Sequence, residues 1–237
     1  MDLMNTILGA AGFIAYFIES VFGFGGTVIF LGLSGLGVDV KTLIYISIYG
    51  SAVASLTIIA YAWRDIAWGH FRRIFMLALP GIVIGTLLIE TIDSIWLLKL
   101  FAVFLIFYGC QGLFFATYKP PAILNNLFVA AGGLLQGLFS TGGPFVLMGY
   151  KDRFANKSEL RAVMAVFFLL ANAWRFVQGA VTGSDMTGVI TSYWWVALPI
   201  IAGVIGGHYI HLRISEKQFR QGILILLLAV GVGYLFR

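Results

Sequence analysis

The chain has 237 residues, of which 60% are hydrophobic and 11% are charged, and its mean hydropathy is +0.97. A water-soluble domain of this length does not need so much apolar side chain, so the composition excludes an ordinary soluble protein and indicates one whose solvent is the lipid bilayer. In a membrane protein the informative quantity is not the net charge of +5 but which loops hold the basic residues. We therefore expect no nucleic acid partner.

Apolar stretches recur along the whole chain, most of them close to the ~20 residues that a membrane-spanning helix needs. They lie at about 3–19, 42–62, 74–92, 95–116, 123–138, 161–181, 189–211 and 221–236. The runs are continuous and lack the alternation of a transmembrane barrel. They therefore predict an all-α polytopic membrane protein, with two glycine-interrupted segments, 20–38 and 139–150, still to be placed.

A glycine motif occurs twice, once in each of those two segments. Sliding the sequence on itself by 117 residues superimposes Phe22 on Phe139, Gly25 on Gly142 and Gly26 on Gly143. The motif Ala-Leu-Pro at 78–80 also recurs at 197–199. These matches predict two repeats, 1–118 and 119–237, within one integrated transmembrane domain. The alternative is chance matching of residues that are common in apolar sequences.

The positions of the basic residues predict the topology, because cytoplasmic loops are enriched in Lys and Arg. Eleven of the fifteen fall in four loops, at Arg64, Arg72, Arg73, Lys119, Lys151, Arg153, Lys157, Arg161, Arg213, Lys217 and Arg220. The opposite side holds three, Lys41, Lys99 and Arg237. This arrangement requires both glycine-interrupted segments to cross the membrane. We therefore expect ten crossings, five in each half, inverted halves and both termini outside the cytoplasm.

Inverted repeats with broken helices are typical of secondary transporters, whose substrate sites lie where the broken helices meet. We expect half-helices over 28–38 and 145–150, after the paired glycines. A half-helix presents free N–H groups and the positive end of its dipole, and both suit an anion. The residues expected to form this site are Gly25, Gly26, Thr27, Ser140, Thr141, Gly142 and Gly143. The alternative is that these glycines only permit close helix packing, as we expect for Gly81 with Gly85 and for Gly133 with Gly137.

The sequence resembles the sulfite exporter TauE/SafE family, also called the toluene-sulfonate uptake permease family. The resemblance rests on "FGFGGTVIF" at 22–30 and "GLLQGLFSTGGPFVLMGY" at 133–150, and it extends over nearly the whole chain. It implies a multi-pass transporter of the bacterial or archaeal inner membrane that moves small anions, often sulfur-containing ones such as sulfite or sulfonates.

Arg175 and Glu19 are charged residues within predicted spans, where an unpaired charge is costly. Arg175 carries donors that match an oxyanion, and we expect it to bind the substrate. Its alternatives are a snorkelling position near the helix end or a structural pair with an acid such as Glu19. Glu19 is a candidate for coupling transport to protons, with a counter-ion or an interfacial residue as alternatives. Asn172, Ser51 and Ser55 are expected to add polar lining.

The sequence contains no phosphate-binding lysine loop, no Gly-x-Ser-x-Gly elbow and no HExxH, so we expect no enzyme and no cofactor. His208, His211 and Glu216 suggest only a weak zinc site, and we expect no metal. The predicted function is therefore secondary transport, in the export direction, of a small inorganic or organosulfur anion by alternating access. The alternatives are an anion channel or an integral-membrane enzyme. The apolar exterior is equally compatible with a monomer and a homo-oligomer.

Overall fold

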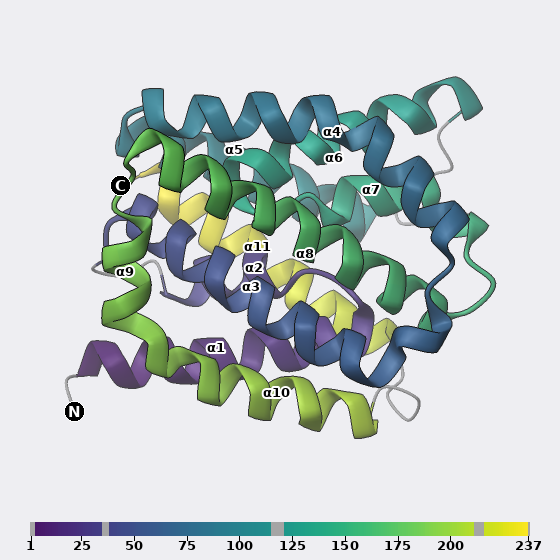
Figure 1. Cartoon of the computed structure of the whole chain (residues 1–237), viewed down its shortest axis with the longest axis horizontal. Coiled ribbons are helices and arrows are strands. Elements are labelled where there is room, and N and C mark those ends of the chain that lie inside the picture. The colour runs from purple at the N-terminus through teal and green to yellow at the C-terminus, as the bar shows by residue number, and fades with distance from the viewer. Residues whose placement is uncertain (1–2, 35–37, 115–120, 211–215, 237) are drawn as a thin grey trace.

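The computed structural model describes residues 3–34, 38–114, 121–210 and 216–236, which form helices and no strand. The helices are α1 (Leu3–Phe22), α2 (Gly26–Ser34), α3 (Val40–Ala62), α4 (Trp68–Thr91), α5 (Ser94–Phe114), α6 (Ala122–Phe139), α7 (Gly143–Tyr150), α8 (Lys157–Thr182), α9 (Met186–Tyr193), α10 (Ala197–Ile210) and α11 (Glu216–Leu235). Figure 1 shows the longer helices running along a common direction, as membrane-spanning helices do. The prediction of an all-α fold is confirmed.

Among the described residues, six helical segments are long and apolar enough to cross a membrane. They are Leu3–Phe22, Val40–Asp65, Trp68–Thr91, Ser94–Phe114, Lys157–Thr182 and Met186–Ile210. The last of these consists of α9, a short 3-10 turn and α10. The expected half-helices are present with shifted ends, because α2 and α7 each begin at the second glycine of the pair and α2 ends at Ser34.

The two ends of the bundle differ in what they contain. Both termini and the α4–α5 turn lie at one end, while the α3–α4 and α7–α8 connections lie at the other (Figure 1). We call these the terminal end and the basic end. Arg64, Arg72, Arg73 and Arg153 belong to the connections at the basic end or to the helix turns beside them. Lys119, Arg213 and Arg237 lie outside the described residues, as do the side chains of Lys151, Lys217 and Arg220.

One basic residue that was assigned to a loop is buried instead. Helix α8 begins at Lys157 with Asn156 as its N-cap, so Arg161 lies in the second turn and only 3% of it is exposed. Its guanidinium donates to the Ser20 hydroxyl at 3.3 Å, and that hydroxyl donates to the Val204 carbonyl. The loop assignment of Arg161 was wrong because the Ser20 hydroxyl of α1, itself bonded to α10, holds the guanidinium in the bundle interior.

Glycines bring the helices into close pairs. Helix α4 packs along α6, where a Cβ on Gly85 would lie 2.8 Å from the Cα of Gly137. Helix α1 packs along α10 at Gly203 and Gly207 in the same manner, and α5 packs along α11 at Gly109. These glycines act as packing residues, as expected for Gly85 and Gly137, because no side chain fits between the backbones.

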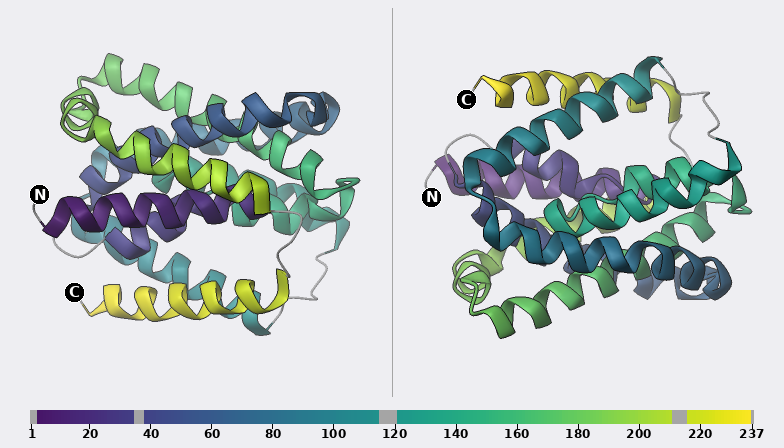
Figure 2. Two further views of the ribbon diagram at one scale, coloured as in Figure 1. Left: turned by 90° about the horizontal axis from the view of Figure 1, so that it is seen from below. Right: turned by 90° about the horizontal axis from the view of Figure 1, so that it is seen from above.

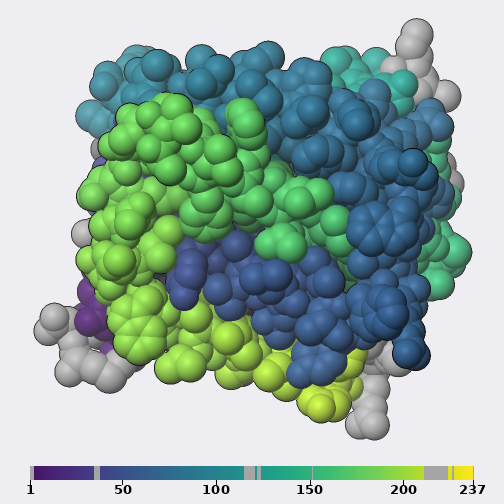
Figure 3. Space-filling model, viewed as in Figure 1, coloured from purple at the N-terminus to yellow at the C-terminus, as the bar shows by residue number. Residues whose placement is uncertain are grey.

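The pairs are arranged around α3 and α8, which pack on each other. On the face shown in Figure 3, α8 fills the space between α3 and α4. Figure 2 shows the α5–α11 pair lying to one side of the remaining helices. The broken segments α1–α2 and α6–α7 therefore lie between this pair and the rest of the bundle.

Candidate functional site

The first break in the helices lies between α1 and α2. Gly23 has φ 84° and Gly25 has φ 93°, values that favour glycine over any residue with a Cβ. The carboxylate of Glu19 accepts a hydrogen bond from the Gly26 N–H at 2.9 Å, so Glu19 caps the half-helix α2 from across the break. A Cβ on Gly26 would lie 2.5 Å from that carboxylate oxygen. The paired glycines thus form the turn and let an acid reach the helix N-terminus.

The second break, between α6 and α7, repeats this geometry with a neutral side chain. Helix α6 ends at Phe139, and Ser140 follows with a left-handed φ of 57°. The side-chain oxygen of Gln136 accepts from the Gly142 N–H at 2.9 Å. Gln136 occupies the position 117 residues after Glu19. The two half-helices therefore have caps from equivalent positions that differ in charge, and Gln136 binds the N–H one residue before the start of its half-helix.

The two breaks lie next to each other. A Cβ placed on Gly143 would lie 3.0 Å from the Cβ of Phe24, so the absence of a side chain at Gly143 permits this contact. Gly25 and Pro144 also line one cavity of about 200 Å³. The structure thus brings the starts of α2 and α7 together, although about 117 residues separate them in the chain.

Polar side chains surround the second break, and some of their atoms have no partner. The Ser140 hydroxyl donates to the Asn172 side-chain oxygen at 2.9 Å, and Gln136 lies 3.4 Å from the same oxygen. The Asn172 amide nitrogen and the Thr141 hydroxyl are buried without a hydrogen-bond partner. A buried donor without a partner is unfavourable, so these atoms are suited to receive a ligand. Further buried oxygens without a partner are those of Ser51, Ser55 and the second carboxylate oxygen of Glu19.

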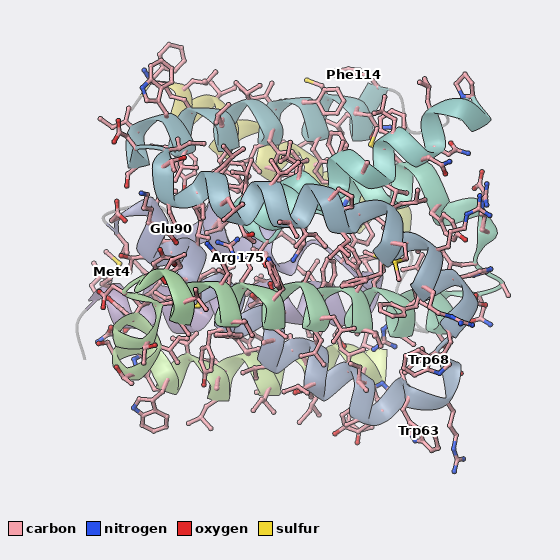
Figure 4. The ribbon with its side chains drawn as sticks, turned by 45° about the horizontal axis from the view of Figure 1, so that its top comes forward. Met4, Trp63, Trp68, Glu90, Phe114 and Arg175 are labelled. Carbon is pink, nitrogen blue, oxygen red and sulfur yellow. The ribbon has the colours of Figure 1, made fainter. Side chains whose placement is uncertain are left out.

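Arg175 is buried, with 1% of its surface exposed, and it lies against the end of α6. Its guanidinium donates to the Gly137 carbonyl at 2.6 Å and approaches the Leu138 carbonyl at 3.4 Å. Figure 4 shows Arg175 near the middle of the bundle, with Glu90 to one side. Glu90 accepts from the Tyr45 hydroxyl at 3.1 Å, and both interact electrostatically with Arg175. The guanidinium thus stabilises the carbonyl end of a broken helix.

These contacts exclude one of the roles considered for Arg175 and one of those considered for Glu19. Arg175 is too deeply buried to be a snorkelling residue, and it donates hydrogen bonds to backbone carbonyls. Glu19 bonds to the Gly26 N–H, and it is 2% exposed, so it does not lie at an interface. The arginine and the acid therefore stabilise opposite types of helix end, carbonyl and N–H respectively.

Sequence reasoning did not assign a role to Gln136, although the offset of 117 residues pairs it with Glu19. It also missed the polar residues Tyr108, Gln111 and Lys157 that line the cavity beside the breaks. In sequence they lie far from the glycine motifs, so only the fold brings them to the site. Of the residues considered for zinc, His208 stacks on the ring of Tyr61 at 4.6 Å. His211 and the side chain of Glu216 lie outside the described residues.

Comparison with known proteins places these features in a family. The family model described as "Sulfite exporter TauE/SafE" matches residues 8–234. A protein named "Probable inner membrane transporter protein TsaS", from Comamonas testosteroni, is 26% identical over 175 residues, which cover 72% of this chain and 73% of that protein. A "Probable sulfite/organosulfonate exporter TauE" from Cupriavidus necator is 27% identical over 224 residues, which cover 87% of this chain and 82% of that protein. No solved structure matches the chain.

Proposed function

The chain belongs to the sulfite exporter TauE/SafE family, and on that premise we propose that it exports small sulfur-containing anions, sulfite or an organosulfonate. It is a multi-pass protein of the inner membrane, and it is a transporter and not an enzyme. The choice of anion follows from the name of the Cupriavidus necator relative, a probable sulfite/organosulfonate exporter. The observation that supports it most is the meeting of two half-helix N-termini beside donors without partners, because helix N-termini favour anions.

We propose an architecture of two inverted halves, 1–118 and 119–237. Pairing each helix with its counterpart 117 to 122 residues later matches α1 with α6, α2 with α7, α3 with α8, α4 with α9–α10, and α5 with α11. If each helix is replaced by its counterpart in the other half, the close pair α1–α10 becomes α6–α4, which is also a close pair. The pairs α3–α8 and α5–α11 map onto themselves. This agreement supports the repeat independently of the sequence matches. The cytoplasm is assigned to the basic end.

The anion site that we propose lies between the starts of α2 and α7. Gly25 precedes α2, and Gly26 and Thr27 begin its first turn. Ser140, Thr141, Gly142, Gly143 and Asn172 contribute the other wall. The donors are backbone N–H groups, the Asn172 amide nitrogen and the Thr141 hydroxyl. Arg175 supplies the fixed positive charge. The carrier exposes this site to one side at a time by moving some of its helices against the others.

Glu19 gives this site a means of coupling to protons. As a carboxylate it places a negative charge on the N-terminus of α2, where it repels an arriving anion. Once protonated it is neutral, like Gln136 at the equivalent cap. We therefore propose that the anion binds together with a proton on Glu19. A divalent oxyanion that leaves with one proton remains negative, so a membrane potential that is negative inside drives its export.

Ligand-dependent stability tests this proposal, because a ligand that binds only the folded protein raises its unfolding temperature. Purified protein is heated with sulfite, sulfate, thiosulfate, sulfoacetate or chloride. We expect sulfite or an organosulfonate to stabilise the protein selectively and Asn172→Ala to remove the effect. An equal response to chloride and sulfite, or no response to any anion, contradicts the proposal.

An anion channel is the second candidate, and it differs from a carrier in whether both sides of the path open together. Transport by a carrier saturates with the anion concentration, and an anion on the far side of the membrane accelerates exchange. Proteoliposomes that show a linear, unsaturable flux without exchange would favour the channel.

A further inference from the structure

Two cavities lie along the same three helices, at opposite ends of the bundle. The first has about 200 Å³ and is lined by Val28 of α2, by Tyr108 and Gln111 of α5 and by Leu224 of α11. Lys157, the first residue of α8, also lines it, so this cavity lies toward the basic end. The second has about 190 Å³ and is lined by Leu31, Asp39, Ser94, Leu98 and Tyr234. It lies toward the terminal end, because α5 begins and α11 ends there.

A cluster of aromatic rings lies between the two cavities. We call Phe101, Phe104, Phe139 and Tyr234 the aromatic barrier, and all four are buried. The ring of Phe101 lies 5.3 Å from that of Phe139, 6.0 Å from that of Phe104 and 6.5 Å from that of Tyr234. Phe101 also lines the second cavity, and Phe139 directly precedes the second break. The barrier thus separates the second cavity from the proposed anion site.

The α5–α11 pair that carries most of this barrier forms a unit. Close approach at Gly109 and Gly231 joins the two helices. The pair also contacts α2 and α3, and its rings pack on Phe139 of α6 and Phe145 of α7. One hydrogen bond in the contact with α2 runs from the Tyr234 hydroxyl to the Leu31 carbonyl, at 2.8 Å. Movement of the pair relative to α2 therefore requires this hydrogen bond to break.

We propose that the anion passes between α2 and the α5–α11 pair, that the aromatic barrier closes this path on the terminal side, and that Phe101 is its central residue. This proposal rests on the transport function proposed above. In the structure the first cavity borders both breaks at Gly25 and Pro144, so the site faces the basic end. Lys157 places a positive charge beside that cavity. Movement of the α5–α11 pair separates the rings and exposes the site to the terminal side.

Labelling of single cysteines tests the path without using any substrate. In a Cys110→Ser background, Met148→Cys places a thiol in the first cavity and Leu98→Cys places one in the second. A membrane-impermeant maleimide is added to each face of membrane vesicles. We expect Met148→Cys to react from the basic end only and Leu98→Cys from the terminal end only. Val103→Cys, on the exposed side of α5, is the lipid-facing control and should react from neither.

Removal of the barrier residue tests the gate. Phe101→Ala should let the reagent reach Met148→Cys from the terminal side, with labelling at least roughly tenfold faster, because a closed gate is open only about 10% of the time or less. Phe101→Leu keeps apolar packing without the ring and should give a smaller increase. Phe114→Ala removes an exposed ring from the same helix and should change nothing.

Three outcomes would overturn the gate. The first is reaction of Leu98→Cys from the basic end with Phe101 intact, and the second is the absence of reaction of Met148→Cys from either face. The third is an unchanged labelling rate of Met148→Cys from the terminal side in both Phe101 variants. The labelling results do not depend on the anion. The expected labelling without sulfite transport would therefore contradict the proposed function but support the proposed path. Saturable sulfite transport together with any of these three outcomes would support the proposed function but contradict the gate.

Discussion

Replacing Arg175 with methionine should destabilise the protein measurably while leaving it folded. Helix α6 ends at Phe139, so the Gly137 and Leu138 carbonyls have no partner in their own helix. The Arg175 guanidinium donates to them at 2.6 and 3.4 Å. A hydrogen bond to a charged group contributes about 1.5–3 kcal/mol, and an unpaired buried carbonyl costs about 1–3 kcal/mol. Removal of a buried charge offsets part of this loss.

The expected net loss is therefore on the order of 1–3 kcal/mol in the free energy of unfolding. For a chain of this length, each kcal/mol lowers the unfolding temperature by about 2–4 °C, which gives a decrease of roughly 2–12 °C. Thermal unfolding in detergent measures it. Arg153→Met is the matched control, because Arg153 is exposed and stacks on Tyr150, and it should change the stability by less than about 0.5 kcal/mol. A methionine variant as stable as the wild type would refute the capping role.

The same series tests the proposed electrostatic role of Arg175 toward the anion. Arg175→Lys keeps the charge but loses the planar fork, so it should weaken anion binding, and Arg175→Ala should weaken it further. The anion-induced increase in unfolding temperature, measured relative to each variant without anion, separates binding from stability. Near wild-type transport by both variants would contradict a substrate-binding role.

Further variants test the breaks and the helix packing. Gly143→Ala places a methyl group 2.9 Å from Phe168 and 3.0 Å from Phe24, so it should separate the two breaks and abolish anion-dependent stabilisation; retention of full stabilisation would contradict the adjacency of the breaks. Gly25→Ala meets no atom within 4 Å, so only its φ of 93° opposes the change, and we expect a loss of about 1 kcal/mol in thermal unfolding; a much larger loss would mean that the site is crowded. Gly85→Leu should prevent α4 from packing on α6 and abolish folded expression, whereas Leu87→Ala, at an exposed position of the same helix, should be tolerated.

The sequence was sufficient to predict the fold class and the broken helices. Continuous apolar runs correspond to spanning helices because the bilayer sets their length. At the first break Gly23 and Gly25 adopt positive φ values, which are accessible to glycine. At the second break Ser140 takes the positive φ, and the paired glycines instead permit close approach of neighbouring atoms. The exact starts of α2 and α7 could not be predicted, since they depend on the caps from Glu19 and Gln136 across each break.

The roles of the charged residues were less accessible to sequence reasoning. The sequence indicated that Arg175 needs a partner, but that partner, the Gly137 carbonyl, lies on another helix. The Ser20 partner of Arg161 also lies on another helix. Arg161 was assigned to a loop because periodicity does not define where α8 begins. The proximity of the two breaks follows from the packing of distant segments, which no local pattern specifies.

Transport of sulfite into proteoliposomes, measured with wild-type protein and with Glu19→Gln at several pH values, tests the central claim most directly. Gln136 demonstrates that an amide can cap a half-helix in this fold, so Glu19→Gln should preserve the structure while removing the titrating group. We predict saturable sulfite transport that depends on pH in the wild type and loses that dependence in Glu19→Gln. The absence of sulfite transport above that of protein-free liposomes, with the protein folded, would contradict the export of sulfite through this site, and an unchanged pH dependence in the variant would contradict coupling through Glu19.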